Sequence, residues 1–181
     1  YASKNTTLGV VLTGNTSPNN DRSFNTSYLK NNVGIIDSIV TARGSEEGIW
    51  KNAGVNLNFR HTLDSTGREI TADLDYINYI ADKDQLFTNS SYQPDWTKKY
   101  SDQLMGSLPS DIKIYSAKLD YVHPFKKGLK MEAGLKYSFV NTDNTAGYFI
   151  LADGVKTVDY EKTNQFTYKE NINAAYINFS R

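Results

Sequence analysis

The stretch LKMEAGLKYSF, residues 129–139, decides the fold class. Its odd positions are all apolar or aromatic, whereas its even positions are Lys, Glu, Gly, Lys and Ser. Side chains alternate between the two faces of a strand, so this period of two predicts a β-strand with one apolar and one polar face. A helix would space its apolar residues three and four positions apart, so the pattern excludes a helix.

The same alternation recurs along the chain. It is found at residues 7–13, 55–60, 69–76 and 115–121. The last segment, residues 168–180, alternates less cleanly, because Ile172 is out of phase with Ile177. We therefore expect a β-bulge near Ile172.

The connections between these segments alternate in length. Asp64–Gly67 and Pro124–Gly128 are short turns that end in Gly. Three other connections are polar and long, roughly residues 30–48, 83–111 and 143–164. We predict an all-β, antiparallel, up-and-down meander of about six long strands, with the short turns at one end and the long loops at the other. The predicted strands cover residues 6–17 (with or without a continuation through 22–29), 48–63, 68–82, 111–124, 129–143 and 165–180.

Composition excludes several classes of function. The 181 residues contain 20 Lys plus Arg, 20 Asp plus Glu and no Cys. The charge balance removes the electrostatic argument for a nucleic-acid partner. Without Cys there is no disulfide, thiol nucleophile or zinc–thiolate site. The chain is polar, with a mean hydropathy of -0.55, yet it contains 13 Tyr and 8 Phe.

Two architectures fit a meander with one apolar face. In a soluble barrel or sheet the apolar face points inward, whereas in a membrane barrel it faces lipid and the polar face lines the lumen. The predicted strands are far longer than the ~5–6 residues usual in soluble sheets, which favours the membrane barrel. Aromatic residues near both strand ends either form two interfacial girdles or reflect the ordinary β-propensity of Tyr and Phe. The first would contain Phe59, Tyr121 and Phe125, and the second Trp50, Tyr79, Tyr137 and Phe139.

Most of the chain also resembles a known family. Residues 110–144 (SDIKIYSAKLDYVHPFKKGLKMEAGLKYSFVNTDN), 166–181 (FTYKENINAAYINFSR) and 54–79 (GVNLNFRHTLDSTGREITADLDYINY) resemble outer-membrane β-barrel proteins of the TonB-dependent receptor group of Bacteroidetes. The resemblance implies that residues 1–181 are a single internal segment of a barrel wall of about 22 strands, without the plug domain.

The resemblance also implies a location, a function and partners. The segment would lie in the bacterial outer membrane and belong to a receptor or transporter that takes up a nutrient through TonB-type coupling. Its partners would be outer-membrane lipid and the remaining barrel strands and plug of the parent chain. The alternative is a soluble β-barrel or β-sheet module that binds carbohydrate or lipid.

No group of residues predicts catalysis. Asp73 and Asp75 share a strand face, but Lys residues on the same polar face make ion pairing the simpler explanation. His61 and His123 precede the two short turns, with no third ligand at a useful spacing. We expect no catalytic residue, no metal, no cofactor and no enzymatic activity.

Ligand contact is expected in the long loops. Tyr92, Trp96 and Tyr100 lie among amide and hydroxyl residues, and Tyr148 lies in the following loop. Aromatic platforms beside such groups suit a sugar or a peptide. The alternative is that these aromatic residues pack the loop upon itself or line an interface.

The alternation also predicts facing, ion pairing and association. Leu135 should share a face with Leu119, and Lys118 and Asp120 should pair with Glu132 and Lys136 across the neighbouring strand. Edge strands carry unpaired N–H and C=O groups. The fragment should therefore pair with strands of its parent chain or self-associate, unless the sheet curls around its apolar face.

Overall fold

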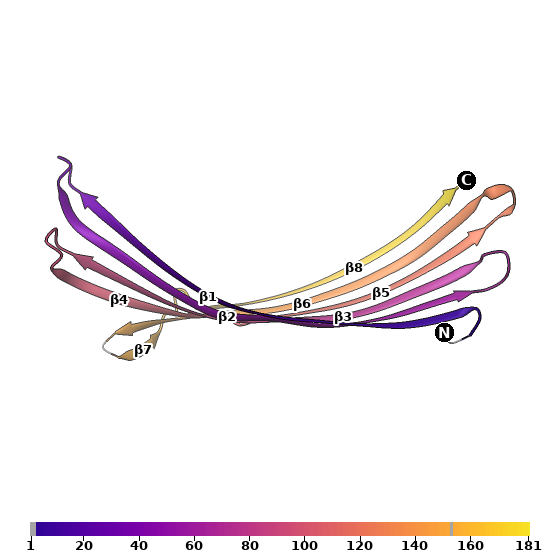
Figure 1. The fold of residues 1–181 in the computed structure, drawn as a ribbon, viewed down its shortest axis with the longest axis horizontal. Helices are drawn as coiled ribbons and strands as arrows, with labels where there is room; N and C mark the ends of the chain where they lie inside the picture. Colours follow the sequence, from indigo (N-terminus) through magenta and orange to yellow (C-terminus); the bar gives the residue numbers. More distant parts are fainter. Residues whose placement is uncertain (1–2, 153) are drawn as a thin grey trace.

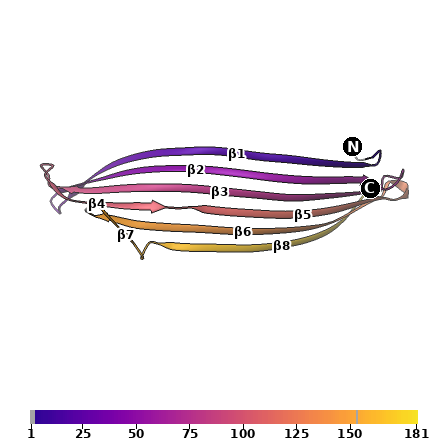
Figure 2. The ribbon, with the colours of Figure 1, turned by 90° about the horizontal axis from the view of Figure 1, so that it is seen from below.

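The computed structural model describes residues 3–152 and 154–181, which form one curved antiparallel sheet (Figure 1). Its strands are β1 (Thr6–Lys30), β2 (Ile36–Thr62), β3 (Glu69–Tyr92), β4 (Lys98–Ser107), β5 (Ser110–Pro124), β6 (Lys130–Ala152), β7 (Val155–Val158) and β8 (Asn164–Ser180), with a 3-10 turn at Lys126–Gly128. β1 and β8 lie at opposite margins of the sheet (Figure 2). The predicted all-β antiparallel fold is confirmed.

β4 and β5 are two parts of one long strand. Ser107 pairs with Asp84 and Ser110 pairs with Ala81, so the register along β3 is the same on both sides of the interruption. The interruption falls at Pro109, which has no N–H to donate to the ladder. Figure 2 shows β4 leading directly into β5. Counted as one strand, they give six long strands beside the short β7, in agreement with the predicted number.

The three predicted long loops are wrong. The β1–β2 and β3–β4 connections contain only residues 31–35 and 93–97, and β6 runs on to Ala152 before a hairpin leads into β7. The continuation of the first strand through residues 22–29 is confirmed, because β1 runs unbroken to Lys30. These segments escape prediction because polar side chains occur on both of their faces, so no apolar alternation marks them. Their Ser, Thr and Asn side chains nevertheless allow the backbone pairing to continue.

The expected bulge near Ile172 is also wrong. Ile172 pairs with Ser138 in a β6–β8 register that continues without a shift from Lys130 to Ala146. Ile172 therefore belongs to the polar face, where it is 46% exposed.

The two faces have the predicted composition. Leu119 pairs with Leu135 and Ala72, and Leu74 pairs with Leu57, so apolar side chains of neighbouring strands lie on one face. Directly paired residues always share a face. Among the described residues, Ile39 is the only buried apolar side chain, and Leu135 is 58% exposed. The sheet therefore has no hydrophobic core of its own.

A carboxylate holds the β2–β3 turn. Asp64 accepts hydrogen bonds from the hydroxyl of Thr66 at 2.5 Å, the backbone N–H of Thr66 at 2.9 Å and Nε of Arg68 at 2.6 Å. The hydrogen bond from the Thr66 hydroxyl, followed by that from Arg68, holds the pKa of Asp64 well below its usual range. Gly67 closes the turn with a φ of 89°, a left-handed conformation that Gly adopts without a steric penalty.

Gly134, on the polar face, leaves space for the Tyr176 side chain of β8 to reach across β6. Gly134 pairs with Asp120 of β5 and with Tyr176 of β8, so the three residues lie in one row. The Tyr176 hydroxyl donates a hydrogen bond to Asp120 Oδ1 at 2.8 Å. A Cβ atom at position 134 would overlap both the Tyr176 ring and the Asp120 carboxylate. Gly134 therefore allows a side-chain link between two strands that are not neighbours.

We expect Gly134→Ala to destabilise the folded barrel by about 1–3 kcal/mol, because the added methyl group displaces the Tyr176 ring. Gly14→Ala is the matched control, since the nearest atom to its new Cβ would be the Asn52 carbonyl oxygen at an ordinary 3.6 Å. The measurement is the unfolding midpoint of each variant of the full-length protein in detergent. Equal midpoints for the two variants would contradict the link.

Candidate functional site

The apolar face, which carries Leu119 and Leu135, has a row of aromatic rings toward one end. The ring centroids of Tyr76 and Tyr115 are 4.9 Å apart, and those of Tyr115 and Phe139 are 6.1 Å apart. These three residues are paired directly across β3, β5 and β6. The row, called the aromatic row below, marks one boundary of the apolar band.

Aromatic residues also mark the other boundary. Tyr121 lies on the same strand face as Tyr115, about 20 Å further along β5 at ~3.3 Å per residue. His123 and Phe125 follow it, with ring centroids 4.4 Å apart. The apolar band therefore lies between two aromatic boundaries, the arrangement expected of a lipid-facing surface.

The predicted membership of the second girdle needs correction. Trp50 pairs with Ala81, and Tyr79 pairs with Asn52, which places both aromatic rings on the polar face. Their ring centroids are 5.6 Å apart. Tyr137 and Phe139 do lie on the apolar face, in register with Ala117 and Tyr115. The prediction for Trp50 and Tyr79 fails because nearness to a strand end does not specify a face.

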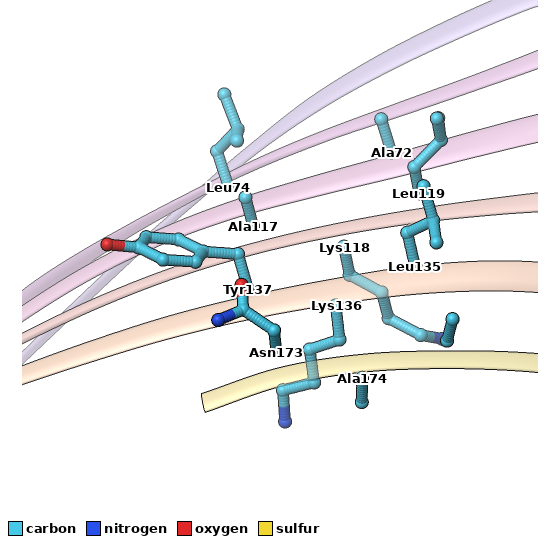
Figure 3. Close-up of a pocket in the computed structure, with 11 residues that line it drawn as sticks. Ala72, Leu74, Ala117, Lys118, Leu119, Leu135, Lys136, Tyr137, Asn173 and Ala174 are labelled. Atoms are coloured by element: carbon cyan, nitrogen blue, oxygen red, sulfur yellow. The ribbon is translucent and has the colours of Figure 1, made fainter. Parts of the chain in front are cut away.

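A shallow groove crosses the apolar band (Figure 3). It has a volume of about 600 Å³, and its lining includes Ala72, Leu74, Ala117, Leu119 and Leu135. The small Ala side chains leave the floor low between the taller Leu side chains. Figure 3 shows Leu74, Leu119 and Leu135 on one side of the sheet and Lys118 and Lys136 on the other. The groove has the chemistry of a surface for acyl chains.

The polar face carries charges along its strands. Lys118 Nζ lies 2.6 Å from Asp120 Oδ2, and Arg60 Nη2 lies 2.7 Å from Glu69 Oε2. Lys118 lies directly opposite Lys136. Exposed pairs of this kind contribute at most about 1 kcal/mol each, and two facing Lys side chains require solvent between them. This face is suited to water.

The predicted cross-strand ion pairs are therefore only partly right. Lys118, Asp120, Glu132 and Lys136 share the polar face, as expected. However, Asp120 lies opposite Gly134, and Glu132 pairs with Lys130 two residues along its own strand. The register sets this outcome, because it places like charges opposite each other and leaves each carboxylate nearest to a Lys of its own strand.

Beyond the aromatic row the polarity of the two faces inverts. On β5, Asp111 and Lys113 take the side that is apolar elsewhere, and Lys113 Nζ lies 2.9 Å from Asp111 Oδ2. Ile112 and Ile114 take the other side. Ile114 pairs with Ile77 of β3 and with Val140 of β6, so three neighbouring strands invert in the same row.

The inversion has a signal in the sequence that strand-by-strand alternation overlooks. Two large apolar residues stand next to each other at Tyr76–Ile77, Ile114–Tyr115 and Phe139–Val140. Each such pair shifts the alternation by one position. These phase changes in the period-two pattern mark the level of the sheet at which the faces exchange polarity.

The four predicted ligand residues do not form one site. Tyr92 and Trp96 come together at the β3–β4 turn, with ring centroids 5.5 Å apart, and Trp96 is 51% exposed. Tyr100 pairs with Ser91, which places it on the opposite face from Tyr92. Tyr148 pairs with Gly106, about 20 Å along the strand from Tyr100. Only Tyr92 and Trp96 therefore form a joint aromatic surface.

The two His side chains have separate partners. His61 Nδ1 lies 2.8 Å from the Thr6 hydroxyl, and His123 Nδ1 lies 2.8 Å from the Tyr121 hydroxyl. Within residues 3–152 and 154–181 no group of three or more His, Asp or Glu side chains could hold a metal ion. The same part of the chain contains no helix that is long and apolar enough to cross a membrane.

Comparison with known proteins identifies the class. Residues 61–181 match the outer membrane protein beta-barrel family, and the chain belongs to this family. No curated protein matches the sequence. Membership places the protein in the bacterial outer membrane, with its apolar band toward lipid and its polar face toward the lumen. It does not favour the alternative of a soluble binding module.

We expect Leu135→Lys to reduce insertion into the outer membrane strongly and Lys136→Ala to have little effect. A Lys facing lipid near the middle of the bilayer costs about 2–4 kcal/mol. Removing an exposed lumenal charge costs less than about 1 kcal/mol. The measurement is the amount of folded full-length protein in the outer-membrane fraction. If both variants insert equally well, Leu135 does not face lipid.

Proposed function

We propose that the chain is part of the wall of an outer-membrane receptor or transporter that takes up a nutrient through TonB-type coupling. The observation that carries the proposal is an open, two-sided sheet whose polar face is charged and hydrated, with Lys118 opposite Lys136. A narrow barrel fills its interior with side chains, whereas a wide barrel encloses a lumen. Charges spread along this face suit the wide barrel.

The free margins of the sheet support a barrel wider than this chain. β1 and β8 each pair on one side only, so their outer N–H and C=O groups have no ladder partner among the described strands. In lipid each unsatisfied group costs several kcal/mol. Leu12 of β1 is 75% exposed and Ile177 of β8 is 62% exposed. Further strands of the parent chain, or those of a second copy, would pair with both margins.

The ends of the sheet suggest how the barrel works. The strands β1, β2, β3 and β6 contain 23–27 residues, well beyond the ~9–11 that cross a bilayer, so they extend the wall into water. Tyr92 and Trp96 stand at the tip of this extension and would meet a ligand first. Coupling to the inner membrane through a plug is supported by the resemblance of residues 54–79 and 110–181 to TonB-dependent receptors. The wall itself performs no chemistry.

The lumen can be tested with neighbouring single-Cys variants. Ser116→Cys should react in intact cells with a water-soluble maleimide, because Ser116 shares the polar face with Lys118. Ala117→Cys should stay unlabelled, because Ala117 lies on the lipid side between Leu74 and Tyr137. Labelling is read from gel shifts of the full-length protein without other reactive Cys. The opposite pattern would reverse the assignment of the faces.

Coupling can be tested by uptake. A strain without the gene is compared with a complemented strain for uptake of cobalamin, a ferric siderophore, oligosaccharides and oligopeptides. We expect one uptake activity to depend on the gene and to be lost as well in cells that lack TonB. Uptake that needs this protein and continues without TonB would contradict the coupling.

A further inference from the structure

The level where the faces invert also contains a hollow on the lumenal side. One row of paired residues runs from Trp50 through Ala81, Ser110 and Asn144 to Phe166, across five strands. All five side chains share the lumenal face, since directly paired residues lie on the same side. The row bounds a hollow of about 490 Å³, which we call the inner hollow. Its volume lies within the ~300–1,000 Å³ usual for small-molecule sites.

Aromatic rings stand on both sides of the inner hollow. Trp50 is paired with Tyr79 at 5.6 Å on one side, and Phe166 with Tyr168 at 6.4 Å on the other. Trp50 and Phe166 are separated by four strand spacings, about 19 Å at ~4.8 Å each. Trp50 is 40% exposed, and Phe166, on the margin strand β8, is 56% exposed. Each side is thus a pair of neighbouring rings exposed in a polar surface, and exposed patches of this kind mark sites of interaction.

The floor between the rings offers hydrogen bonds but no free charge. Ser110 donates a hydrogen bond to Asn144 Oδ1, which leaves the Asn144 amide as a donor. Of the described lining residues only Lys83 is charged, and its Nζ lies 2.7 Å from Glu46 Oε1. An ionic ligand would therefore find no unpaired charge to bind.

These features select one class of ligand. A lipid chain would leave the Asn144 amide donor, which the bond to Ser110 does not use, without a partner, and that is costly. An extended peptide usually binds by adding a strand to a free edge. Of the strands beneath the inner hollow only β8 has such an edge, and it is the margin with which further barrel strands would pair. A neutral sugar has apolar CH faces that stack on aromatic rings and hydroxyl groups that bond to amide and hydroxyl side chains. The width between Trp50 and Phe166 suits several linked rings.

We infer that the inner hollow binds a neutral oligosaccharide, stacked between the Trp50–Tyr79 and Phe166–Tyr168 pairs. The inference rests on the proposed function, because it names the class of nutrient that the barrel would admit. Trp50 and Phe166 supply the stacking surfaces. Ser110 and Asn144 supply the hydrogen bonds that orient the hydroxyl groups.

The test uses the purified full-length protein in detergent, titrated calorimetrically with maltotetraose, cellotetraose and xylotetraose. At least one should bind, and Trp50→Ala and Phe166→Ala should each weaken that binding at least ten-fold. Phe24→Ala is the matched control, because Phe24 is similarly exposed at 62% but lies on β1 in contact with Arg43 on the outer side. It should leave the affinity unchanged. Tetra-alanine should not compete.

Three results would overturn the inference. The first is that no tetrasaccharide binds at millimolar concentration. The second is that binding occurs but is equally strong in Trp50→Ala. The third is that binding occurs but is equally strong in Phe166→Ala. Uptake that depends on the gene but not on Trp50 would leave the proposed function standing and remove only this site.

Discussion

The structure depends on one constraint: in lipid, every backbone N–H and C=O group must find its partner within the protein. A continuous antiparallel ladder meets this requirement, and here the ladder between β2 and β3 runs from Thr62 to Ile39 without a shift. Each strand then has two independent faces, because pairing uses only the backbone. The side chains need no common core, which explains why almost none of the described apolar side chains is buried. Lipid, water and further strands take the place that a hydrophobic core has in a soluble domain.

The polarity of each face of the sheet changes along the strands with the medium that surrounds it. Within the apolar band, Leu119 and Leu135 meet lipid while Lys118 and Lys136 meet the lumen. Above the aromatic row the outside is water, and Asp111 and Lys113 appear there. The apolar residues then move to the inside, where Ile114 lies beside Ile77 and Val140. The same strand therefore serves as membrane wall at one level and presents the opposite polarity at the next, without any change in the pairing of the backbone.

The alternation of apolar and polar residues predicts the strand segments that face lipid, but it does not predict their extensions beyond the bilayer. Alternation around Leu135 arises from a difference between lipid and water, so strand type, facing and the two short turns could all be derived from it. Residues 22–30, 36–47 and 83–107 carry polar side chains on both faces, and these resemble the side chains of loops even though the strands pair. Trp50 shows the same limit at the candidate site. Its position near a strand end was evident, but the prediction overlooked that Trp50 is out of phase with Leu57, and the register with Ala81 places its ring on the lumenal face.

The inversion of the faces has a consequence for assembly. A slip of one residue between strands moves every side chain to the wrong face and is strongly disfavoured, but a slip of two residues preserves the faces and would escape that control. Here a two-residue slip between β5 and β6 would bring Lys113 to the level of Phe139 and draw a charge toward the bilayer. The adjacent pair Ile114–Tyr115 of β5 therefore favours one register, in which it lies beside Tyr76–Ile77 of β3 and Phe139–Val140 of β6. In strands that insert into a membrane one after another, such adjacent apolar pairs would fix the depth of each strand in the bilayer as well as which face it turns to lipid.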